Sequence, residues 1–361
     1  MPKAVIVGAG INGLCAARGL VRRGWRVEVV ERGPLPNPAS ASWDRHRLIR
    51  AAYADPALVA RVGAAFAAWE DLWRDLGASH YVERGVLSLS RVPGDRAELL
   101  AEGAGERLAP AEVAERFPML ETEGLRFGIW SPAGGALLAD RILEGLVDWL
   151  VARGVVFHAE APVTAIDRSH GEVTVPGGVV AGDVVVAAAG CGLPALVPDL
   201  AGDLVPHRCV VLYVRPGPEW ATDWARGPAW CDLGGDDELW GLPPMQDIAM
   251  KIGFGGHTRP GDPGDPAEHE VSAADRAAIL GAYAGRFRGA AEFTVERALA
   301  AFFLVAPEER FVLRADRRLV LLSADSGHGF KFGPLTGEAV AEAIVEDGVE
   351  ALARRFAAGW G

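Results

Sequence analysis

Three glycines near the start of the chain have the spacing of a diphosphate-binding turn. Gly8, Gly10 and Gly13 follow the apolar segment 4–7 in the order G-x-G-x-x-G. In this spacing the first glycine permits a tight turn, the second lets the backbone approach a pyrophosphate, and the third lets a helix pack against a strand. Glu31 lies about 20 residues further on, where its carboxylate can accept hydrogen bonds from ribose hydroxyls. The motif predicts a dinucleotide site, but alone it does not separate NAD from FAD.

The elements around these glycines form the pattern of a β-α-β unit. Residues 4–7 and 27–30 are short apolar segments rich in β-branched residues, which is typical of buried strands. Apolar residues recur at helical spacing from Ile11 to Arg23, and Gly24 ends the predicted helix. Because strand, glycines, helix, strand and acid follow in register, the segment favours nucleotide binding over a glycine-rich structural turn.

A second glycine-rich segment near the end of the chain predicts another site for a polar ligand. Residues 319–323 are typical of a strand, a glycine-rich turn follows, and a helix is predicted over 336–346. The start of a helix offers free N–H groups and a partial positive charge. This segment would therefore stabilise negative charge on a ligand placed beside it.

Five segments in order carry a family resemblance. They are the opening β-α-β unit, "SWDRHRLIRAAY" (42–53), "DVVVAAAGCG" (183–192), "LWGLPPMQDIAMKIGFGG" (239–256), and "APEERFVL" (306–313) leading into "GHGFKFGPLTGE". Together they resemble the FAD-dependent amine oxidases of the D-amino-acid oxidase superfamily, and most closely their sarcosine oxidase and N-methyl amino acid oxidase branch. The resemblance implies that FAD oxidises the C–N bond of an amino acid or N-alkyl amino acid, giving an imine and hydrogen peroxide.

The resemblance gives catalytic roles to three cations. Arg50 and Lys331 would hold a substrate carboxylate, and Lys251 would lie beside flavin N5, where a fixed positive charge stabilises developing superoxide. Arg47, expected one helical turn before Arg50, would support it or face the flavin. For each of these residues the sequence leaves open the alternative that the side chain lies on the solvated surface and has no catalytic role.

The resemblance also implies contacts to FAD from several parts of the chain. His328 either contacts the cofactor or satisfies the loop backbone, and the backbone role is favoured. The predicted cofactor-binding residues are Gly8, Gly10, Ile11, Asn12, Gly13, Glu31, Arg32, Ser42, Arg47, Val163, Ala189, Gly190, Gly327, Gly329, Phe330 and Lys331.

The chain departs from the branch at several positions. Covalent-flavin members carry a cysteine where this chain has Ala301, and since no other cysteine is expected nearby, FAD is predicted to bind non-covalently. Sarcosine oxidases carry histidines at the positions of Trp43 and Gly255, and a tyrosine at the position of Phe303. These changes predict a larger or more apolar substrate than sarcosine. The predicted substrate pocket consists of Trp43, Arg50, Trp240, Phe303 and Lys331.

Composition excludes other classes of protein. The 361 residues include 36 Lys+Arg and 48 Asp+Glu, a net charge of −12, which argues against nucleic acid or an anionic membrane as the main partner. The four cysteines, Cys15, Cys191, Cys209 and Cys231, form no CxxC pair, so neither a metal site nor a disulfide framework is expected. Without a signal peptide or membrane span, the chain is predicted to be cytoplasmic. We expect a monomer or small homo-oligomer whose partners are a small amino acid or amine and dioxygen.

The fold class predicted from these patterns is α/β with two domains. Residues 1–79, 136–203 and 312–361 are expected to form a discontinuous Rossmann-type FAD-binding domain, and residues 80–135 and 204–311 an antiparallel β-sheet substrate domain. Two other functions remain open. One is a dehydrogenase of the same fold that passes electrons to a quinone or a partner protein, and the other is a non-catalytic flavoprotein subunit.

Smaller features are also predicted. Asp140 is expected to cap a helix that runs to about Arg153. Residues 57–76 are expected to form a helix that buries Trp69 and Trp73, and the acids within 232–238 are expected to lie in a solvated turn.

Overall fold

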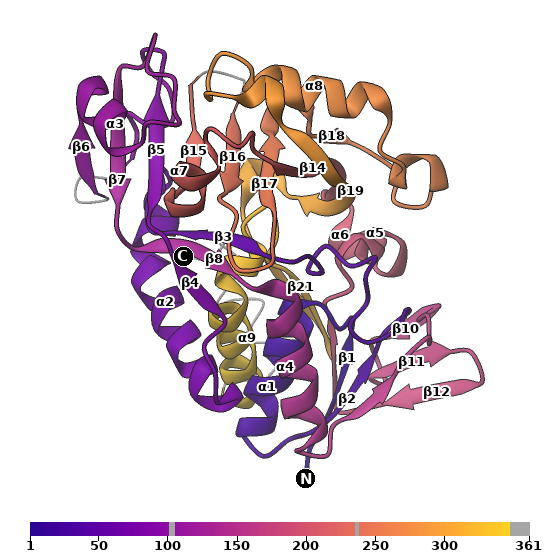
Figure 1. Ribbon diagram of the computed structural model, residues 1–361. Helices are drawn as coiled ribbons and strands as arrows, with labels where there is room; N and C mark the ends of the chain where they lie inside the picture. Colours follow the sequence, from indigo (N-terminus) through magenta and orange to yellow (C-terminus); the bar gives the residue numbers. More distant parts are fainter. Residues whose placement is uncertain (101–104, 235–237, 347–361) are drawn as a thin grey trace.

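The structure is a computed structural model that describes residues 1–100, 105–234 and 238–346 (Figure 1). A unit built on a parallel sheet lies below a unit built on a largely antiparallel sheet. The predicted α/β fold class is confirmed. The predicted domain boundaries stay a prediction, and residues 347–361 of the last predicted segment lie outside the described residues.

The lower unit is organised around a six-stranded sheet. In sheet order its strands are β20 (Val312–Asp316), β21 (Leu319–Ser323), β13 (Val184–Ala187), β1 (Lys3–Val7), β2 (Arg26–Val30) and β9 (Val156–His158). The strands from β21 to β9 pair in parallel, whereas β20 joins the edge antiparallel to β21. The central strands are valine-rich and buried on both faces, as expected for a parallel sheet covered on both sides.

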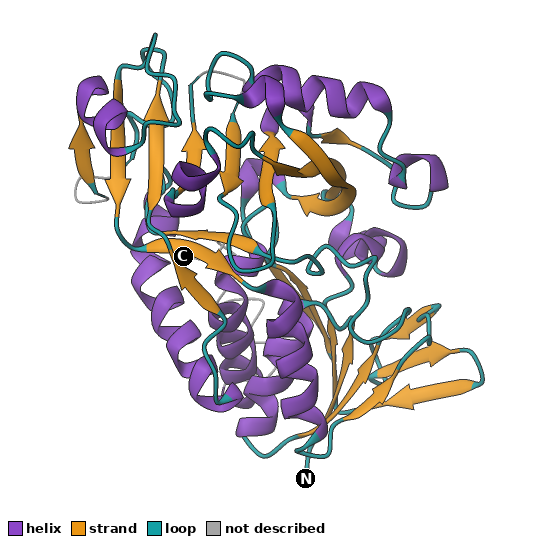
Figure 2. Cartoon of the chain, in the orientation of Figure 1, coloured by secondary structure: helices purple, strands orange, loops and turns teal. Residues whose placement is uncertain are grey.

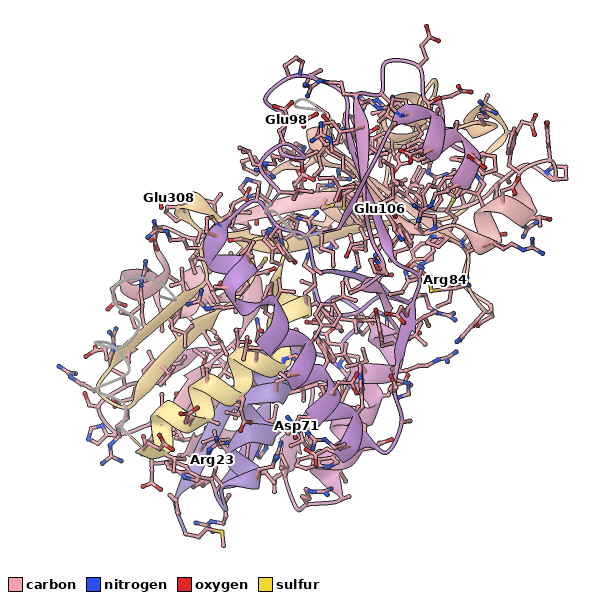
Figure 3. The ribbon with its side chains drawn as sticks, turned by 90° about the vertical axis from the view of Figure 1, so that its left-hand side faces the viewer. Arg23, Asp71, Arg84, Glu98, Glu106 and Glu308 are labelled. Carbon is pink, nitrogen blue, oxygen red and sulfur yellow. The ribbon has the colours of Figure 1, made fainter. Side chains whose placement is uncertain are left out.

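Helices gather on one face of this sheet (Figure 2). They are α1 (Ile11–Arg22), α2 (Pro56–Leu76), α4 (Ala139–Val151) and α9 (Gly329–Glu346). Helices α1 and α9 approach closely because α9 has Gly337 at the contact, where a Cβ would lie 2.4 Å from a backbone carbon of Cys15. Asp71 of α2, labelled in Figure 3, accepts a hydrogen bond of 2.7 Å from Arg18 of α1. Trp69 and Trp73 are buried in this layer, as predicted.

The opposite face of the parallel sheet is covered by a small sheet and short helices. Val5, Val7 and Val185 pack there against residues of these elements, such as Val180 and Leu193. The elements are β10 (Ala165–Asp167), β11 (Glu172–Val175), β12 (Gly178–Ala181), α5 (Leu193–Leu196) and α6 (Pro198–Ala201). Gly190–Gly192 forms a 3₁₀ turn between β13 and α5.

The upper unit is organised around a nine-stranded sheet. Its strands, in sheet order, are β18 (Arg259–Pro260), β14 (Val205–Arg215), β17 (Met250–Phe254), β16 (Leu239–Leu242), β15 (Ala229–Asp232), β5 (Val86–Ser90), β7 (Phe127–Ser131) and β6 (Glu106–Leu108), and β19 (Thr294–Val305) also pairs with β14. All pairs are antiparallel except β15 with β5. Around this sheet lie α3 (Pro110–Arg116), α7 (Ala221–Arg226) and α8 (Ala273–Tyr283).

A three-stranded sheet lies where the two units meet (Figure 1). Its order is β3 (Arg47–Arg50), β8 (Gly134–Leu137) and β4 (Tyr81–Glu83). The helical turn expected between Arg47 and Arg50 is therefore wrong. Residues 47–50 are extended because they pair antiparallel with β8, where Gly134 leaves room for the backbone of Ile49. Sequence spacing alone could not show this partner, which lies far along the chain.

Other local predictions also need correction. The N-cap of α4 is Leu138, and Asp140 lies inside the first turn, where its carboxylate accepts from the N–H of Arg141. The last helix begins at Gly329 rather than at residue 336. Asp232 is fully buried and accepts a 2.6 Å hydrogen bond from Arg91, so it does not lie in a solvated turn. Residues 235–237 of that segment lie outside the described residues.

Over the described ranges, every helix is too short or too polar to cross a lipid bilayer. The four cysteines are all unpaired thiols.

Candidate active site

One cavity lies at the carboxyl ends of β1, β2 and β13, beside the start of α1. Its volume is about 330 Å³. We call it the glycine cavity, because Gly8 and Gly10 form part of its wall. Of the predicted cofactor-binding residues, it is lined by Gly8, Gly10, Ile11, Asn12, Glu31, Arg32, Ser42, Val163, Ala189 and Gly190.

The glycines meet the steric demands that the motif predicts. Gly8 has φ +104°, and a Cβ there would lie 2.5 Å from the carbonyl oxygen of Ala188. Gly13 does not line the cavity, but a Cβ on it would lie 2.0 Å from the carbonyl oxygen of Gly8. Gly13 therefore lets α1 pack against the turn that follows β1, which is the task expected of the third glycine.

Polar groups hold the loops of the glycine cavity in place. The carboxylate of Glu31, 6% exposed, accepts from the N–H of Ala9 at 2.7 Å and from the side-chain amide of Asn37 at 2.8 Å. Ser42 Oγ accepts from the N–H of Ile11 at 3.0 Å, close to the start of α1. Glu31 thus links the turn after β1 to the loop after β2, at the position expected for a ribose acceptor.

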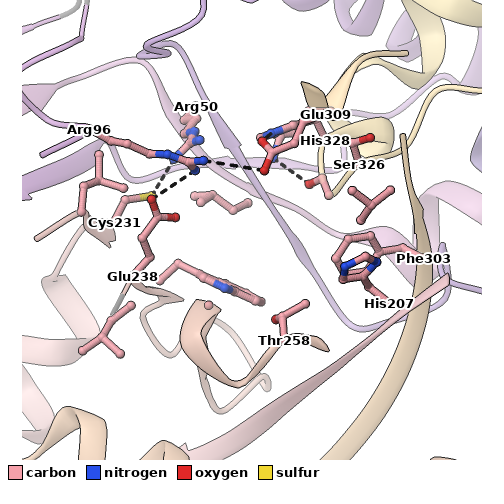
Figure 4. Close-up of a pocket in the computed structure, with 18 of the residues that line it drawn as sticks. Arg50, Arg96, His207, Cys231, Glu238, Thr258, Phe303, Glu309, Ser326 and His328 are labelled. Atoms are coloured by element: carbon pink, nitrogen blue, oxygen red, sulfur yellow. Dashed lines mark hydrogen bonds and ion pairs between the residues drawn. The ribbon is translucent and has the colours of Figure 1, made fainter. Parts of the chain in front are cut away.

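The second cavity, of about 730 Å³, lies between the two units and is shown in Figure 4. We call it the cation cavity, because Arg50, Lys251 and Lys331 line it. The structure thus brings together three side chains from β3, β17 and α9. Of the other predicted residues, Arg47, Trp240, Phe303, Gly327 and Phe330 also line it.

Three predicted residues, Gly13, Trp43 and Gly329, line neither cavity. Trp43 packs against the helical layer of the lower unit and is not part of the pocket wall that was expected for it. Gly329 lies at the turn into α9, where a Cβ would lie 1.9 Å from the carbonyl oxygen of Ala324. It shapes that turn as Gly13 shapes the first one.

The two cavities adjoin. Asp325 lines the glycine cavity and the next residue, Ser326, lines the cation cavity. Asp325 is buried, which raises the pKa of its carboxyl to about 6, and it accepts from the N–H of Leu304 at 3.2 Å. The two cavities thus meet at Asp325 and Ser326, so that one extended ligand can reach from the glycine cavity into the cation cavity.

Arg50 and Lys331 carry positive charge, and no carboxylate among the described residues forms an ion pair with either of them. Arg50 donates to the sulfur of Cys231 at 3.1 Å, and its guanidinium lies 4.7 Å from the centre of the Tyr53 ring. Within the part of the chain that the structure describes, the buried Nε of Arg50 has no hydrogen-bond partner. Lys331 Nζ donates to the carbonyl oxygen of Gly327 at 3.2 Å. Burial, together with the charge of Arg50, lowers the pKa of Lys331 to about 7. Such a pair suits an anionic ligand.

Lys251 is 1% exposed and held by a carboxylate. Its Nζ donates to Asp44 Oδ2 and, at 3.1 Å, to the carbonyl oxygen of His46. Burial lowers the pKa of Lys251 to about 8, although the charge of Asp44 opposes this. The sequence prediction missed Asp44, whose only signal was an acid inside the basic segment "SWDRHR".

The mouth of the cation cavity carries an ion-pair cluster that the sequence did not reveal (Figure 4). Arg96 lies 3.1 Å from Glu238 and 3.6 Å from Glu309, measured between nitrogen and oxygen atoms. His328 Nε2 lies 3.9 Å from Glu309, and burial, aided by the charge of Lys331, lowers the pKa of His328 to about 3. The His328 ring bonds to no backbone group in the described part of the chain, contrary to the favoured prediction.

Cys191 lines the glycine cavity, and two further cysteines also lie closer to the site than predicted. Cys231 lines the cation cavity, and Cys209 of β14 is the cross-strand partner of Ala301 of β19. The expectation that no cysteine is near is therefore wrong, because pairing of distant strands brings them there. Among the described residues, no cluster of histidine, cysteine or acidic side chains has the arrangement of a metal site.

Comparisons with known proteins agree with this geometry. A family model described as FAD dependent oxidoreductase (DAO) matches residues 3–343. Monomeric sarcosine oxidase of Streptomyces avermitilis is 25% identical over 94% of this chain and 92% of its own length. N-methyl-L-tryptophan oxidase of Yersinia pestis is 24% identical over 93% of each chain. The solved structure of NikD, described as an unusual amino acid oxidase essential for nikkomycin biosynthesis, has a TM-score of 0.81 at 21% identity and covers 96% of this chain and 95% of its own.

Proposed function

We propose that this chain, which belongs to the family of FAD dependent oxidoreductases, oxidises the C–N bond of an N-alkyl amino acid or amino acid and passes the electrons to dioxygen. The observation that carries the proposal is the convergence of Arg50, Lys251 and Lys331 on one cavity that adjoins the glycine cavity. The names of the relatives, a sarcosine oxidase and an N-methyl-L-tryptophan oxidase, support the same class of reaction.

The joined cavities suit FAD. The turn at Gly8 and Gly10, with the start of α1, would hold the diphosphate, and Glu31 would accept from the ribose. The flat ring would lie in the cation cavity. When bound, FAD supplies the acceptor for a hydride equivalent from the carbon next to nitrogen. The protein's own task is to place that carbon and to exclude competing reactions.

The substrate would be held by its carboxylate. The guanidinium of Arg50 can donate two parallel hydrogen bonds to a carboxylate, and Lys331 adds a second positive charge. The rings of Trp240, Phe303 and Phe330 line the rest of the cavity and favour a substrate with apolar bulk over sarcosine. Lys251 would place a positive charge where dioxygen gains negative charge.

We also propose that FAD is held without a covalent bond. The methyl side chain of Ala301 cannot form a thioether, and Cys209 opposite it is buried and lines neither cavity. Cys231 lines the cation cavity, where it accepts from Arg50. Acid precipitation of the purified protein tests this. A colourless pellet with a yellow supernatant is expected, whereas a yellow pellet would contradict the proposal and point to Cys231 or to Cys191, which lines the glycine cavity.

The Asp44–Lys251 contact favours a second candidate, a dehydrogenase of the same fold. Because a buried carboxylate faces Lys251, the positive charge available to dioxygen is reduced. Such a protein would pass its electrons to a quinone or a protein rather than to air. The rate at which the reduced protein is reoxidised by air distinguishes the two functions.

The test is the visible spectrum of the purified protein under nitrogen during additions of N-methyl, cyclic and ordinary amino acids, followed by air. Bleaching of the yellow bands, with rapid return and formation of peroxide, is the expected result. Bleaching with slow return would favour the dehydrogenase. A yellow protein that no carboxylate-bearing amine bleaches would contradict the proposed substrate class.

A further inference from the structure

We propose that Asp44 is a positioning residue that keeps Lys251 protonated and directs its ammonium group along the wall of the cation cavity. The inference rests on the proposed function, because the charge of Lys251 matters only if that residue acts on dioxygen. Its physical content, a buried lysine held charged by one carboxylate, can be measured without turnover.

The contacts of Asp44 leave its carboxylate fully engaged. Its side chain is 0% exposed. Oδ2 accepts from Lys251 Nζ and from a guanidinium nitrogen of Arg47, while Oδ1 accepts from the hydroxyl of Tyr213 and, at 2.9 Å, from the N–H of Arg45. Such a network over-determines the position of the carboxylate, and therefore of the ammonium group bound to it.

The fold brings these groups together across the junction of the two units. Tyr213 and Lys251 are directly opposed in the pairing of β14 with β17. Asp44 belongs to the segment that leads into β3, two residues after Ser42, which contacts the start of α1. One short segment thus touches the glycine cavity through Ser42, Lys251 through Asp44, and the cation cavity through Arg47 and Arg50.

The charges around Lys251 show why it needs this carboxylate. Burial raises the pKa values of Cys209 and Tyr213, and lowers the pKa of His46 to about 3, so all three are neutral near pH 7. Among the described groups that act on the charge of Lys251, Asp44 is therefore the one anion. The groups that face Lys251 are Asp44, His46 and Arg47 from the segment 44–50, and Cys209 and Tyr213 from β14, while β16 contributes the ring of Trp240.

Removal of Asp44 should therefore convert the Lys251 side chain to a neutral amine, rather than leave an unpaired ammonium group. Without Asp44, the pKa of the buried Lys251 should fall further, because burial and the like charge of Arg47 both favour the neutral amine. A neutral amine offers dioxygen no fixed positive charge. Lys251 thus needs the ion pair with Asp44 to stay protonated, even though the carboxylate reduces the positive potential that dioxygen would meet.

The composition of the chain makes the measurement direct. The whole sequence contains only three lysines, Lys3, Lys251 and Lys331. Lysine labelled with ¹³C at Cε therefore gives three resonances, which Lys251→Met and Lys331→Met assign. The titration is followed by NMR in the holoprotein for the wild type, Asp44→Asn and Asp44→Glu.

The Lys251 resonance of Asp44→Asn should titrate at least about one pH unit below that of the wild type, and Asp44→Glu should recover most of this shift. Air reoxidation of the reduced flavin should fall about tenfold at pH 8 in Asp44→Asn and recover toward pH 6. An unchanged Lys251 titration in Asp44→Asn would overturn the inference. A wild type that reacts slowly with air at every pH would instead contradict the proposed function and leave the NMR result intact.

A double variant covers the case in which Asp44→Asn does not fold. Asp44→Asn combined with Lys251→Met removes both charges, so it should fold if the carboxylate serves to compensate the lysine. Failure of the double variant to fold as well would show that Asp44 serves Arg47 and Tyr213 structurally, and would also overturn the inference.

Discussion

The glycine cavity takes much of its wall from the backbone turns after β1 and β13, whereas the cation cavity takes much of its wall from side chains on strands and helices, among them β3, β16, β17 and α9. A cavity wall formed by backbone requires small residues and one local backbone conformation, so a short sequence motif can encode it. A wall of cations needs distant strands in register and, at Lys251, a buried carboxylate as counter-charge. The first cavity is therefore local in sequence and sensitive to shape, while the second is long-range and sensitive to charge.

The largest effect is expected where shape is tested. Gly13→Val places side-chain atoms against the carbonyl oxygen of Gly8, which already lies 2.0 Å from an ideal Cβ. We expect loss of bound FAD and a fall of about 3 kcal/mol in the free energy of unfolding. Flavin absorbance per protein and urea unfolding measure the two changes.

Gly63→Ala is the matched control. Gly63 lies within α2 with nothing near its Cβ position, so alanine should keep FAD bound and raise stability by about 0.5–1 kcal/mol. Equal flavin loss in both variants would mean that the turn at Gly8 is not what holds the diphosphate.

The next effect tests charge in the other cavity. Arg50→Met removes the forked donor from the cation cavity, so kcat/KM for carboxylate-bearing amines should fall about 100-fold while flavin content stays unchanged. Steady-state kinetics with an amine that lacks a carboxylate provide the comparison, since its kcat/KM should change little. Arg74→Met, on the exposed surface of α2, is the matched control. Equal losses with both kinds of amine would argue against a carboxylate clamp.

The contrast between the cavities also explains what sequence could predict. The β-α-β unit, its glycines and Glu31 lie within one short segment, so their spacing contained the geometry. Lys251 and Asp44 are 207 residues apart, and their contact depends on the register of β14 with β17. Nothing in the local pattern of either residue encodes that register.

Two errors have the same origin. Residues 47–50 were expected to be helical because their partner strand lies far along the chain, at Gly134–Leu137. Cys231 was considered remote from the site, although β15 carries it to Arg50. One sequence signal was not used, namely that the chain contains only three lysines. Two of them, Lys251 and Lys331, line the cation cavity.

A pH effect of intermediate size is expected from Lys331. Its pKa is about 7, so the ammonium group is present below that pH and lost above it. An anion binds the protonated form better, so the Kd of a carboxylate inhibitor such as benzoate should rise about tenfold between pH 6 and pH 9. Flavin difference spectra measure this Kd. Lys331→Arg should remove the pH dependence, and a wild-type Kd that falls with rising pH would contradict the assignment.

The smallest effect is expected at the mouth of the cation cavity, where solvent weakens charge. The Arg96 side chain is 55% exposed, and its partners Glu238 and Glu309 are 27% and 51% exposed. Exposed pairs of this kind contribute little, so Arg96→Met should change the free energy of unfolding by less than about 0.5 kcal/mol and KM by about two- to threefold. Urea unfolding and steady-state kinetics test both. A tenfold change in KM would mean that Arg96 contacts the substrate itself. The site that binds the carboxylate would then extend from the buried cations to the exposed mouth of the cavity, and the difference between these two regions would not hold.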